Sequence, residues 1–531
     1  MYTTNSAREN REGSWSLAAD GAGEPQGEGQ GRNPEMNDHE RSNERVVPTK
    51  PGNKSATAEA DSVEGRRSTA ENPKQRNANR AQKRGNAPSG LQRVREAARR
   101  DKTTRFTTLL HHVTPKLLEE AYRGLKRSAA AGIDGQTWKD YGQQLASNLA
   151  DLHGRIHRGA YRAKPGRRSY IAKADGTQRA LAIAAIEDKI VQSAVSEVLN
   201  AIYEEDFFGF CYGFRKKKSQ HDALSALATA LLKRKVNWVL DADIRGFFDT
   251  IDHEWMRKFV EHRVGDQRVV RLIMKWLKAG VMEEGKWIEP EQGTPQGGTI
   301  SPLLANIYLY YAFDTWAHHW RRRKAKGDVV IVRYADDFVV GFEHQEDAQR
   351  FRIELGERLR KFALELHSDK TRVVEFGRFA VERRARRGEG KPETFTFLGF
   401  THVCTKNRRG WFHLGRVTNR KRMTRKLHEI GVQLKARRHD PIPEQGRWLR
   451  SVVQGHDNYY AIPGNMEALR AFRRGIAWLW RTALRRRSQR TRLTKARMQR
   501  LCAKWLPPAE ILHPSSNEPF PVNICGRNRM R

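Results

Sequence analysis

Three aspartates are the residues of this chain whose type and spacing could carry chemistry. Asp336 and Asp337 are adjacent, and Asp243 lies upstream at the end of an apolar run. Adjacent carboxylates repel each other unless a cation lies between them. Magnesium takes oxygen ligands, and two ions about 3.5–4 Å apart can hold the attacking and leaving oxygens of an in-line phosphoryl transfer. These aspartates therefore predict a site for two Mg²⁺ ions, with Mn²⁺ as the alternative ion.

Such a site needs one strand and one neighbouring hairpin to bring the acids together. Residues 329–332 and 338–342 are short apolar, largely β-branched runs on either side of Tyr334-Ala335-Asp336-Asp337. This pattern predicts two strands joined by a tight turn. Residues 239–243 predict the third strand, with Asp243 at its end. Taken alone, the hairpin could also be a solvated turn that happens to carry two acids.

Three sequence blocks give these acids a wider context. Asp243 is followed five residues later by Phe248. The second block is Gln292-Gly293-Thr294-Pro295-Gln296-Gly297-Gly298 with Ser301-Pro302-Leu303-Leu304-Ala305-Asn306, and the third is Tyr334-Ala335-Asp336-Asp337. In order and spacing the blocks resemble the reverse transcriptases encoded by bacterial group II introns.

The resemblance implies an RNA-directed DNA polymerase that also binds its intron RNA and assists splicing and retromobility as a maturase. It implies an α+β right-hand fold, in which fingers and a palm with a small antiparallel sheet precede an all-helical thumb or maturase domain. No endonuclease motif with paired cysteines follows, so we expect that optional domain to be absent. The implied partners are group II intron RNA, template RNA, primer or target DNA, and deoxynucleoside triphosphates.

The resemblance also assigns roles to individual residues. Asp243, Asp336 and Asp337 would be catalytic and bind the metal ions, with the backbone carbonyl of Ile244 as a further ligand. Nucleotide-binding roles fall to five side chains: Lys173, Arg179, Phe248, Gln296 and Lys370. Lys173 and Arg179, on a hairpin, would hold the triphosphate. The Phe248 ring would exclude a 2′-hydroxyl, and Lys370 would protonate the leaving pyrophosphate. Asp241, Asp249 and Asp252 are interpreted as structural or solvated acids.

The predicted fingers hairpin, residues 169–183, departs from the family pattern. Alanines stand at 172 and 180, where the family usually has proline, and Ala182 replaces a usual glycine. Because proline restricts the backbone, we expect this hairpin to be less rigid than in its relatives.

Composition indicates a polyanion as partner. The 531 residues carry a formal net charge of +38, far beyond what solubility requires. The four cysteines are far apart and form no Cys-x-x-Cys pair, which argues against a disulfide framework or a zinc ribbon. No apolar run is long enough to span a bilayer. We therefore expect a cytoplasmic bacterial protein that is nucleoid-associated when it is on DNA.

Composition along the chain predicts five regions. We expect a disordered basic and polar tail over residues 1–90, an N-terminal extension over 91–150, fingers and palm over 151–400, thumb or maturase over 401–513, and a short tail over 514–531. Residues 468–509 contain no Asp or Glu and are rich in Arg. Five arginines there are predicted to bind nucleic acid: Arg485, Arg486, Arg487, Arg490 and Arg492.

Two other functions fit part of the pattern. A reverse transcriptase of another bacterial class, such as a defence or diversity-generating enzyme, would share the palm. The maturase-like segment at residues 447–465 favours the intron class instead. A non-enzymatic RNA-folding maturase would not need three uncompensated acids facing RNA.

Overall fold

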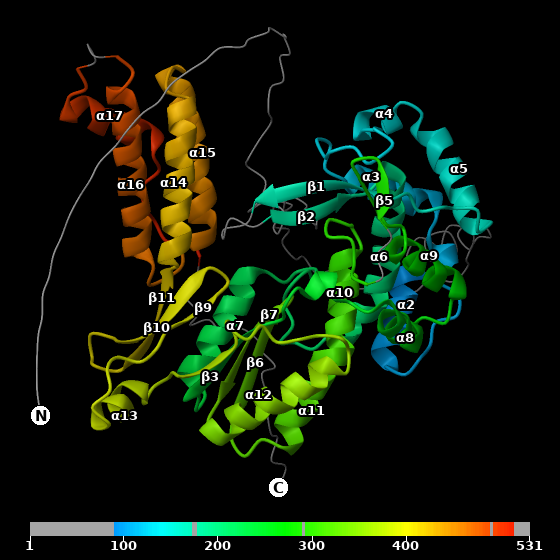
Figure 1. Ribbon diagram of the computed structural model, residues 1–531, viewed down its shortest axis with the longest axis horizontal. Coiled ribbons are helices and arrows are strands. Elements are labelled where there is room, and N and C mark those ends of the chain that lie inside the picture. The colour runs from blue at the N-terminus through cyan, green and yellow to red at the C-terminus, as the bar shows by residue number, and fades with distance from the viewer. Residues whose placement is uncertain (1–89, 173–177, 289–291, 489–491, 514–531) are drawn as a thin grey trace, which may run out of the picture. The chain divides into compact units, whose positions relative to one another are not determined.

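The structure is a computed structural model that describes residues 90–172, 178–288, 292–488 and 492–513 (Figure 1). The chain divides into two units, Met1–Pro51 and Gly52–Arg531, and every described residue belongs to the second. The expected tails, together with Lys173 and Arg490, lie outside the described residues, so those predictions are not tested.

The N-terminal extension is helical. Thr114 accepts a hydrogen bond from the Leu117 amide and Pro115 occupies the first turn of a helix, as the Thr-Pro pair predicts. The helix therefore begins at Pro115, after the short 3₁₀ turn at residues 110–112. The elements are α2 (Gly90–Arg100), η1 (Leu110–His112), α3 (Pro115–Gly124), α4 (Trp138–Gly142) and α5 (Leu145–His157).

The fingers hairpin is present as predicted. β1 and β2 pair antiparallel from Arg167↔Ile183 to Ala172↔Gln178. Two short strands that the sequence did not indicate extend this sheet, because β4 pairs in parallel with the start of β1. The sheet order is β2-β1-β4-β5, with β1 (Gly166–Ala172), β2 (Gln178–Ile183), β4 (Val281–Glu283) and β5 (Lys286–Ile288).

The palm contains a second four-stranded sheet, in the order β6-β7-β3-β8, and all of its pairings are antiparallel. β6 and β7 are buried almost throughout, which explains why their sequences are apolar rather than alternating. The strands are β3 (Trp238–Asp243), β6 (Val329–Tyr334), β7 (Asp337–Phe342) and β8 (Arg372–Glu375).

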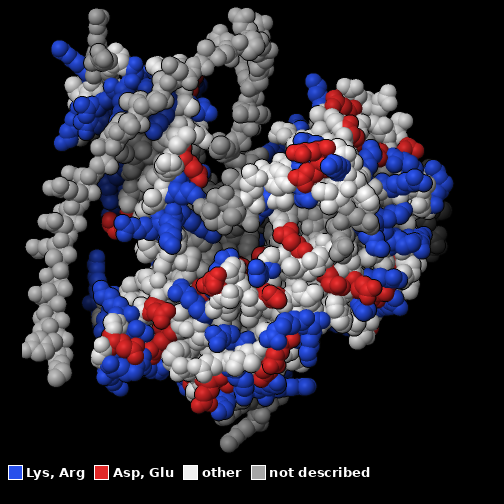
Figure 2. Space-filling view, viewed as in Figure 1, with Lys and Arg blue, Asp and Glu red and all other residues white. Residues whose placement is uncertain are grey.

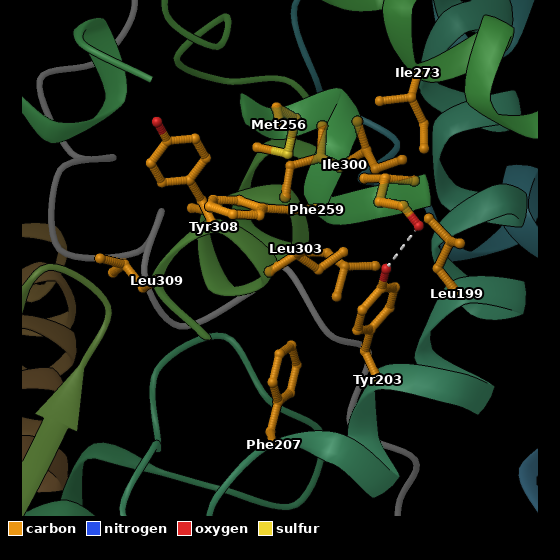
Figure 3. Close-up of a cluster of buried hydrophobic side chains, with 14 of the residues drawn as sticks. Leu199, Tyr203, Phe207, Met256, Phe259, Ile273, Ile300, Leu303, Tyr308 and Leu309 are labelled. Atoms are coloured by element: carbon orange, nitrogen blue, oxygen red, sulfur yellow. Dashed lines mark hydrogen bonds between the residues drawn. The ribbon is translucent and has the colours of Figure 1, made fainter. Parts of the chain in front are cut away.

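Helices surround the sheets and supply most of the core. Figure 3 shows part of this core, where Tyr203 and Leu199 of α6 lie near Phe259 and Met256 of α8 and Leu303 of α10. The Tyr203 hydroxyl donates to a backbone carbonyl, so the buried oxygen is satisfied. These helices are α6 (Ile186–Asp206), α7 (Gln220–Lys233), α8 (His253–Arg263), α9 (Gln267–Leu277), α10 (Ser301–Leu309), α11 (Thr315–Arg323), α12 (Gln345–Arg360) and α13 (Ala380–Arg386), with the 3₁₀ turn η2 (Phe247–Asp249) and the π-helical turn η3 (Tyr310–Asp314).

The predicted all-helical region begins later than residue 401. A three-stranded sheet in the order β11-β10-β9 runs past that boundary to Thr418. Burial alternates over residues 400–403 and again over residues 413–418, the period of two that a strand with one buried face shows. The elements are β9 (Phe395–Phe397), β10 (Phe400–Lys406), β11 (Phe412–Thr418), α14 (Arg420–Ala436), α15 (Ile442–Tyr460), α16 (Met466–Arg485) and α17 (Lys495–Trp505).

The last four helices share a core of their own, in which Trp480 is fully buried and its ring N–H donates to Gln445. α14 lies alongside α16 (Figure 1). We refer to α14–α17 as the C-terminal bundle. None of the described helices combines the length and the apolar character needed to cross a lipid bilayer.

Candidate active site

The structure brings the three predicted aspartates to one end of the palm sheet. Asp243 on β3 and Asp337 on β7 are directly paired in the strand register. Tyr334 pairs with Asp337, so only Ala335 and Asp336 form the turn between β6 and β7. Ala335 has a φ of +55°, as one position of a tight hairpin turn requires. The predicted hairpin and its third strand are therefore both present.

The acids at this edge are close enough to perturb one another. Burial raises the pKa of Asp337 well above its usual range, and Asp336, Asp241 and Asp243 raise it further. Burial also raises the pKa of Asp336, while Arg179 and Lys370 oppose the rise. The pKa of Asp241 is about 6, again mainly because of burial. A cation among these carboxylates would relieve both the repulsion and the cost of burial.

Lys370 already supplies part of that positive charge. Its ammonium nitrogen lies 2.7 Å from Oδ2 of Asp243. The segment that carries the lysine is held beside β3, because the His367 amide donates to the Asp243 carbonyl at 2.8 Å and Ile244 forms an antiparallel bridge with Leu366. Lys370 is thus placed against a predicted metal ligand.

The donor set suits a hard divalent ion, although its side chains are not gathered into a cluster. Carboxylate oxygens are the ligands that magnesium prefers. Among the residues that the structure describes, no three ligand-type side chains converge closely enough to bind one ion as they stand. Asp243 and Asp337 are opposite each other on paired strands, so both side chains lie on the same face of the sheet.

A buried arginine supports the hairpin from behind. Arg333 is fully buried and forms a bidentate pair with Asp314, its Nε lying 2.7 Å from Oδ1. Its Nη1 donates to the Ala335 carbonyl at 2.9 Å and to Oδ1 of Asn306 at 3.1 Å. The guanidinium therefore holds the backbone of the turn that carries Asp336.

The segment from residue 207 to residue 215 packs under the same turn. The Tyr212 amide donates to the Arg333 carbonyl. A Cβ atom on Gly213 would lie 2.3 Å from the Ala335 nitrogen, so glycine is needed for this close approach. Phe210 is buried, and Arg215 is buried and paired with Glu204. The aromatic residues of this segment that are buried here serve packing rather than base stacking.

Gln296, one of the predicted nucleotide-binding residues, lies on a loop that bonds both to β2 and to the segment after β3. The Thr294 amide donates to the Phe248 carbonyl at 2.8 Å, and Nε2 of Gln296 donates to Oδ1 of Asp249 at 2.8 Å. On its other side, the Gln296 carbonyl accepts a 2.7 Å hydrogen bond from the Ala182 amide of β2. Arg179 is exposed on that strand, yet its charge reaches Asp336. Of the predicted nucleotide-binding residues, Lys370 thus contacts Asp243 and Arg179 acts electrostatically on Asp336, whereas the contacts of Gln296 are to Asp249 and β2.

Comparisons with known proteins identify sequence relatives of this chain. A family model described as "Reverse transcriptase (RNA-dependent DNA polymerase)" covers residues 171–402. The chain is 32% identical over 332 residues to "Protein YkfC" of Escherichia coli (strain K12). This alignment covers 54% of this chain and 87% of YkfC. It is 34% identical over 228 residues to "Group II intron-encoded protein LtrA" of Lactococcus lactis subsp. cremoris. That alignment covers 41% of this chain and 37% of LtrA.

The chain belongs to the group II intron-type reverse transcriptases. The activity of this family is RNA-directed DNA polymerisation, and its members use divalent metal ions. A further relative, "Putative COX1/OXI3 intron 1 protein" of Saccharomyces cerevisiae, is 25% identical over 422 residues, 67% of this chain and 50% of that protein. The chain thus spans half or less of LtrA and of this yeast protein.

The predicted RNA-binding arginines of this reverse transcriptase differ in their surroundings. Lys and Arg side chains gather over the outer end of the C-terminal bundle, with few acids among them (Figure 2). Arg485, Arg486 and Arg492 are exposed. Arg487 instead donates to the carbonyls of His439 at 2.9 Å and Asp440 at 2.7 Å. It therefore ties α16 to the turn before α15.

The supporting residues of the catalytic hairpin were not found from the sequence. Arg333 and Asp314 are separated by 19 residues, and no local pattern links them. The one available signal was an arginine inside an otherwise apolar strand, since a buried charge requires a partner.

We predict that removing the hydrogen bonds of Arg333 reduces catalysis without unfolding the palm. The double variant Arg333→Met/Asp314→Leu replaces a buried ion pair with apolar groups, a change that is often close to neutral in stability. It removes the donor to Ala335, so kcat in primer extension should fall, by up to about 100-fold for a displacement near 1 Å. The divalent ion concentration for half-maximal activity should also rise.

The control is Asp314→Leu alone, which leaves a buried guanidinium without its carboxylate and should cost about 3–5 kcal/mol. Unchanged kcat and unchanged metal dependence in the folded double variant would show that Arg333 serves stability only.

Proposed function

We propose that Asp243, Asp336 and Asp337 bind two Mg²⁺ ions, with Mn²⁺ as the alternative, and that the Ile244 carbonyl is a further ligand. The observation that carries this is the direct pairing of Asp243 with Asp337, with Asp336 in the adjoining turn. When bound, the ions would acidify the primer 3′-hydroxyl and neutralise charge on the departing pyrophosphate.

We further propose how the chain's own residues handle the nucleotide. Arg179 and Lys370 supply positive charge beside the aspartates, where the phosphates of a deoxynucleoside triphosphate would lie. Lys370 would also protonate the leaving pyrophosphate. Phe248 would exclude a 2′-hydroxyl, and Gln296 would contact the nucleotide from the neighbouring loop. Lys173 stays a prediction, because it is outside the described residues.

The C-terminal bundle is proposed to bind the intron RNA and so to assist splicing and retromobility. Exposed arginines without compensating acids neutralise phosphates with little dependence on sequence. The relatives LtrA and "Nuclear intron maturase 4, mitochondrial" of Arabidopsis thaliana are named for introns, which supports intron RNA as the partner. The template would be RNA, and the further partners would be primer or target DNA.

Asp336→Ala tests the catalytic assignment. It should reduce cDNA synthesis by at least about 10³-fold, because metal binding contributes several kcal/mol of transition-state stabilisation. RNA affinity should persist. Asp369→Ala is the matched control, since Asp369 is an exposed acid whose carboxylate bonds only to Ser368 among the described residues. Polymerisation by Asp336→Ala at the rate of this control would refute the assignment.

Phe248→Ala tests whether this ring excludes nucleotides with a 2′-hydroxyl. The ring is partly exposed and lies edge-on to Phe247 with centroids 5.4 Å apart. Its removal should open room for a 2′-hydroxyl and increase ribonucleotide incorporation in a competition between dNTP and rNTP. Phe248→Tyr keeps the bulk and should keep the discrimination. If Phe248→Ala discriminates as well as the wild type, another residue excludes the 2′-hydroxyl.

Arg485→Gln/Arg486→Gln tests the RNA-binding surface. Loss of two phosphate contacts should lower the log–log salt slope of intron RNA binding by up to about 1.4–1.8 units. Primer extension on a short generic template should change little. Arg487→Gln is the contrasting variant, because its guanidinium bonds backbone carbonyls; it should lower the unfolding midpoint more than the salt slope. An unchanged slope in the double variant contradicts the proposal.

A further inference from the structure

The hairpin of β10 and β11 ends in a turn with a well-defined structure. The strands pair from Phe400↔Thr418 to Lys406↔Phe412, so residues 407–411 form the tip. Oδ1 of Asn407 accepts hydrogen bonds from the amides of Arg409 at 2.9 Å and Trp411 at 3.0 Å. Gly410, with a φ of +78°, donates to the Asn407 carbonyl at 2.9 Å. These bonds fix the backbone that presents the tip side chains.

Trp411 is the most exposed large hydrophobic side chain among the described residues, at 67%. Within that part of the chain its ring has no aromatic, cationic or hydrogen-bonding partner. By contrast, Trp480 is buried, and Trp448 is covered by Arg437. The indole therefore adds nothing evident to the packing of the fold, while it offers a flat face to solvent.

The charge around the tip selects the chemistry of a partner. Residues 394–428 contain nine Lys and Arg residues and no Asp or Glu. Lys406, Arg408 and Arg409 are exposed, and within the described residues neither arginine has a carboxylate at ion-pair distance. An aromatic ring flanked by unpaired cations suits an anionic strand whose bases are open to stacking.

We propose that the tip, residues 407–411, is a binding site for an unpaired nucleotide of a single-stranded nucleic acid. Trp411 stacks on the base, while Arg408 and Arg409 contact flanking phosphates. A duplex does not fit, because its bases are already stacked and their faces closed. The seven-residue strand β10 places the tip about 20 Å from the Leu398–Gly399 turn. The tip residues are not among those to which the proposed function assigns nucleotide binding.

The test uses the full chain and a short RNA strand that carries one 2-aminopurine. An unlabelled blunt RNA–DNA duplex is added first to occupy the polymerase cleft. Stacking on Trp411 should quench the 2-aminopurine, and Trp411→Ala should abolish the quenching and weaken affinity about 5- to 150-fold, the range for loss of one stacked base. Trp411→Phe should retain much of both. Arg408→Gln/Arg409→Gln should keep the quenching but lower the salt slope by about 1.4 units.

The matched control is Phe379→Ala, since that exposed ring is already covered by Arg383 at 5.8 Å; it should bind like the wild type. A DNA strand of the same sequence, and the RNA as a duplex, complete the set. If Trp411→Ala weakens binding of both the RNA and the DNA strand, the site accepts any single strand. If it weakens binding of the RNA strand alone, the site is specific for RNA. Equal quenching by Trp411→Ala and the wild type, equal quenching of the duplex, or a lowered unfolding midpoint in Trp411→Ala would overturn the proposal. None of these outcomes depends on splicing or polymerisation.

Discussion

The buried Arg333 guanidinium is the contact on which the turn between β6 and β7, with its proposed catalytic Asp336, depends. A charge inside the palm is tolerable only because Asp314 pairs with it, while Asn306, the Ala335 carbonyl and the Cys211 sulfur take its remaining donors. Asp314 closes the π-helical turn η3, a local irregularity that is often found at functional sites. Two aspartates that would otherwise repel each other are thus held on a turn whose backbone is fixed from the protein interior.

The loop at residues 292–298 connects the palm to the fingers by hydrogen bonds. Its amides and side chains bond to the segment after β3, and the Gln296 carbonyl bonds to β2. Through this loop a few backbone hydrogen bonds connect the strand that carries Arg179 to the segment that follows Asp243. Ala182, which replaces the glycine usual in the family, is buried at this junction and still donates its amide. The departure from the family pattern is accommodated there.

Sequence patterns predicted what depends on local periodicity. Apolar strands around residues 334–337 gave the hairpin, and Thr114-Pro115 gave the start of α3. Patterns could not supply contacts between distant residues of ordinary type, such as Arg333 with Asp314. They also could not separate Arg487, which bonds backbone carbonyls, from its exposed neighbours, because a count of arginines does not reveal what each one contacts. Strands of three residues, such as β4, are too short to show a period.

The strongly basic surfaces have a consequence for competition among RNAs. Phosphates are alike in every transcript, so exposed arginines on the C-terminal bundle and along residues 394–428 attract all of them to a similar degree. In a cell, abundant ribosomal and messenger RNA would therefore occupy such surfaces by mass action. Selection of one transcript must come from the minority of contacts that sense an open base or a folded shape, or from synthesis of the protein close to that transcript.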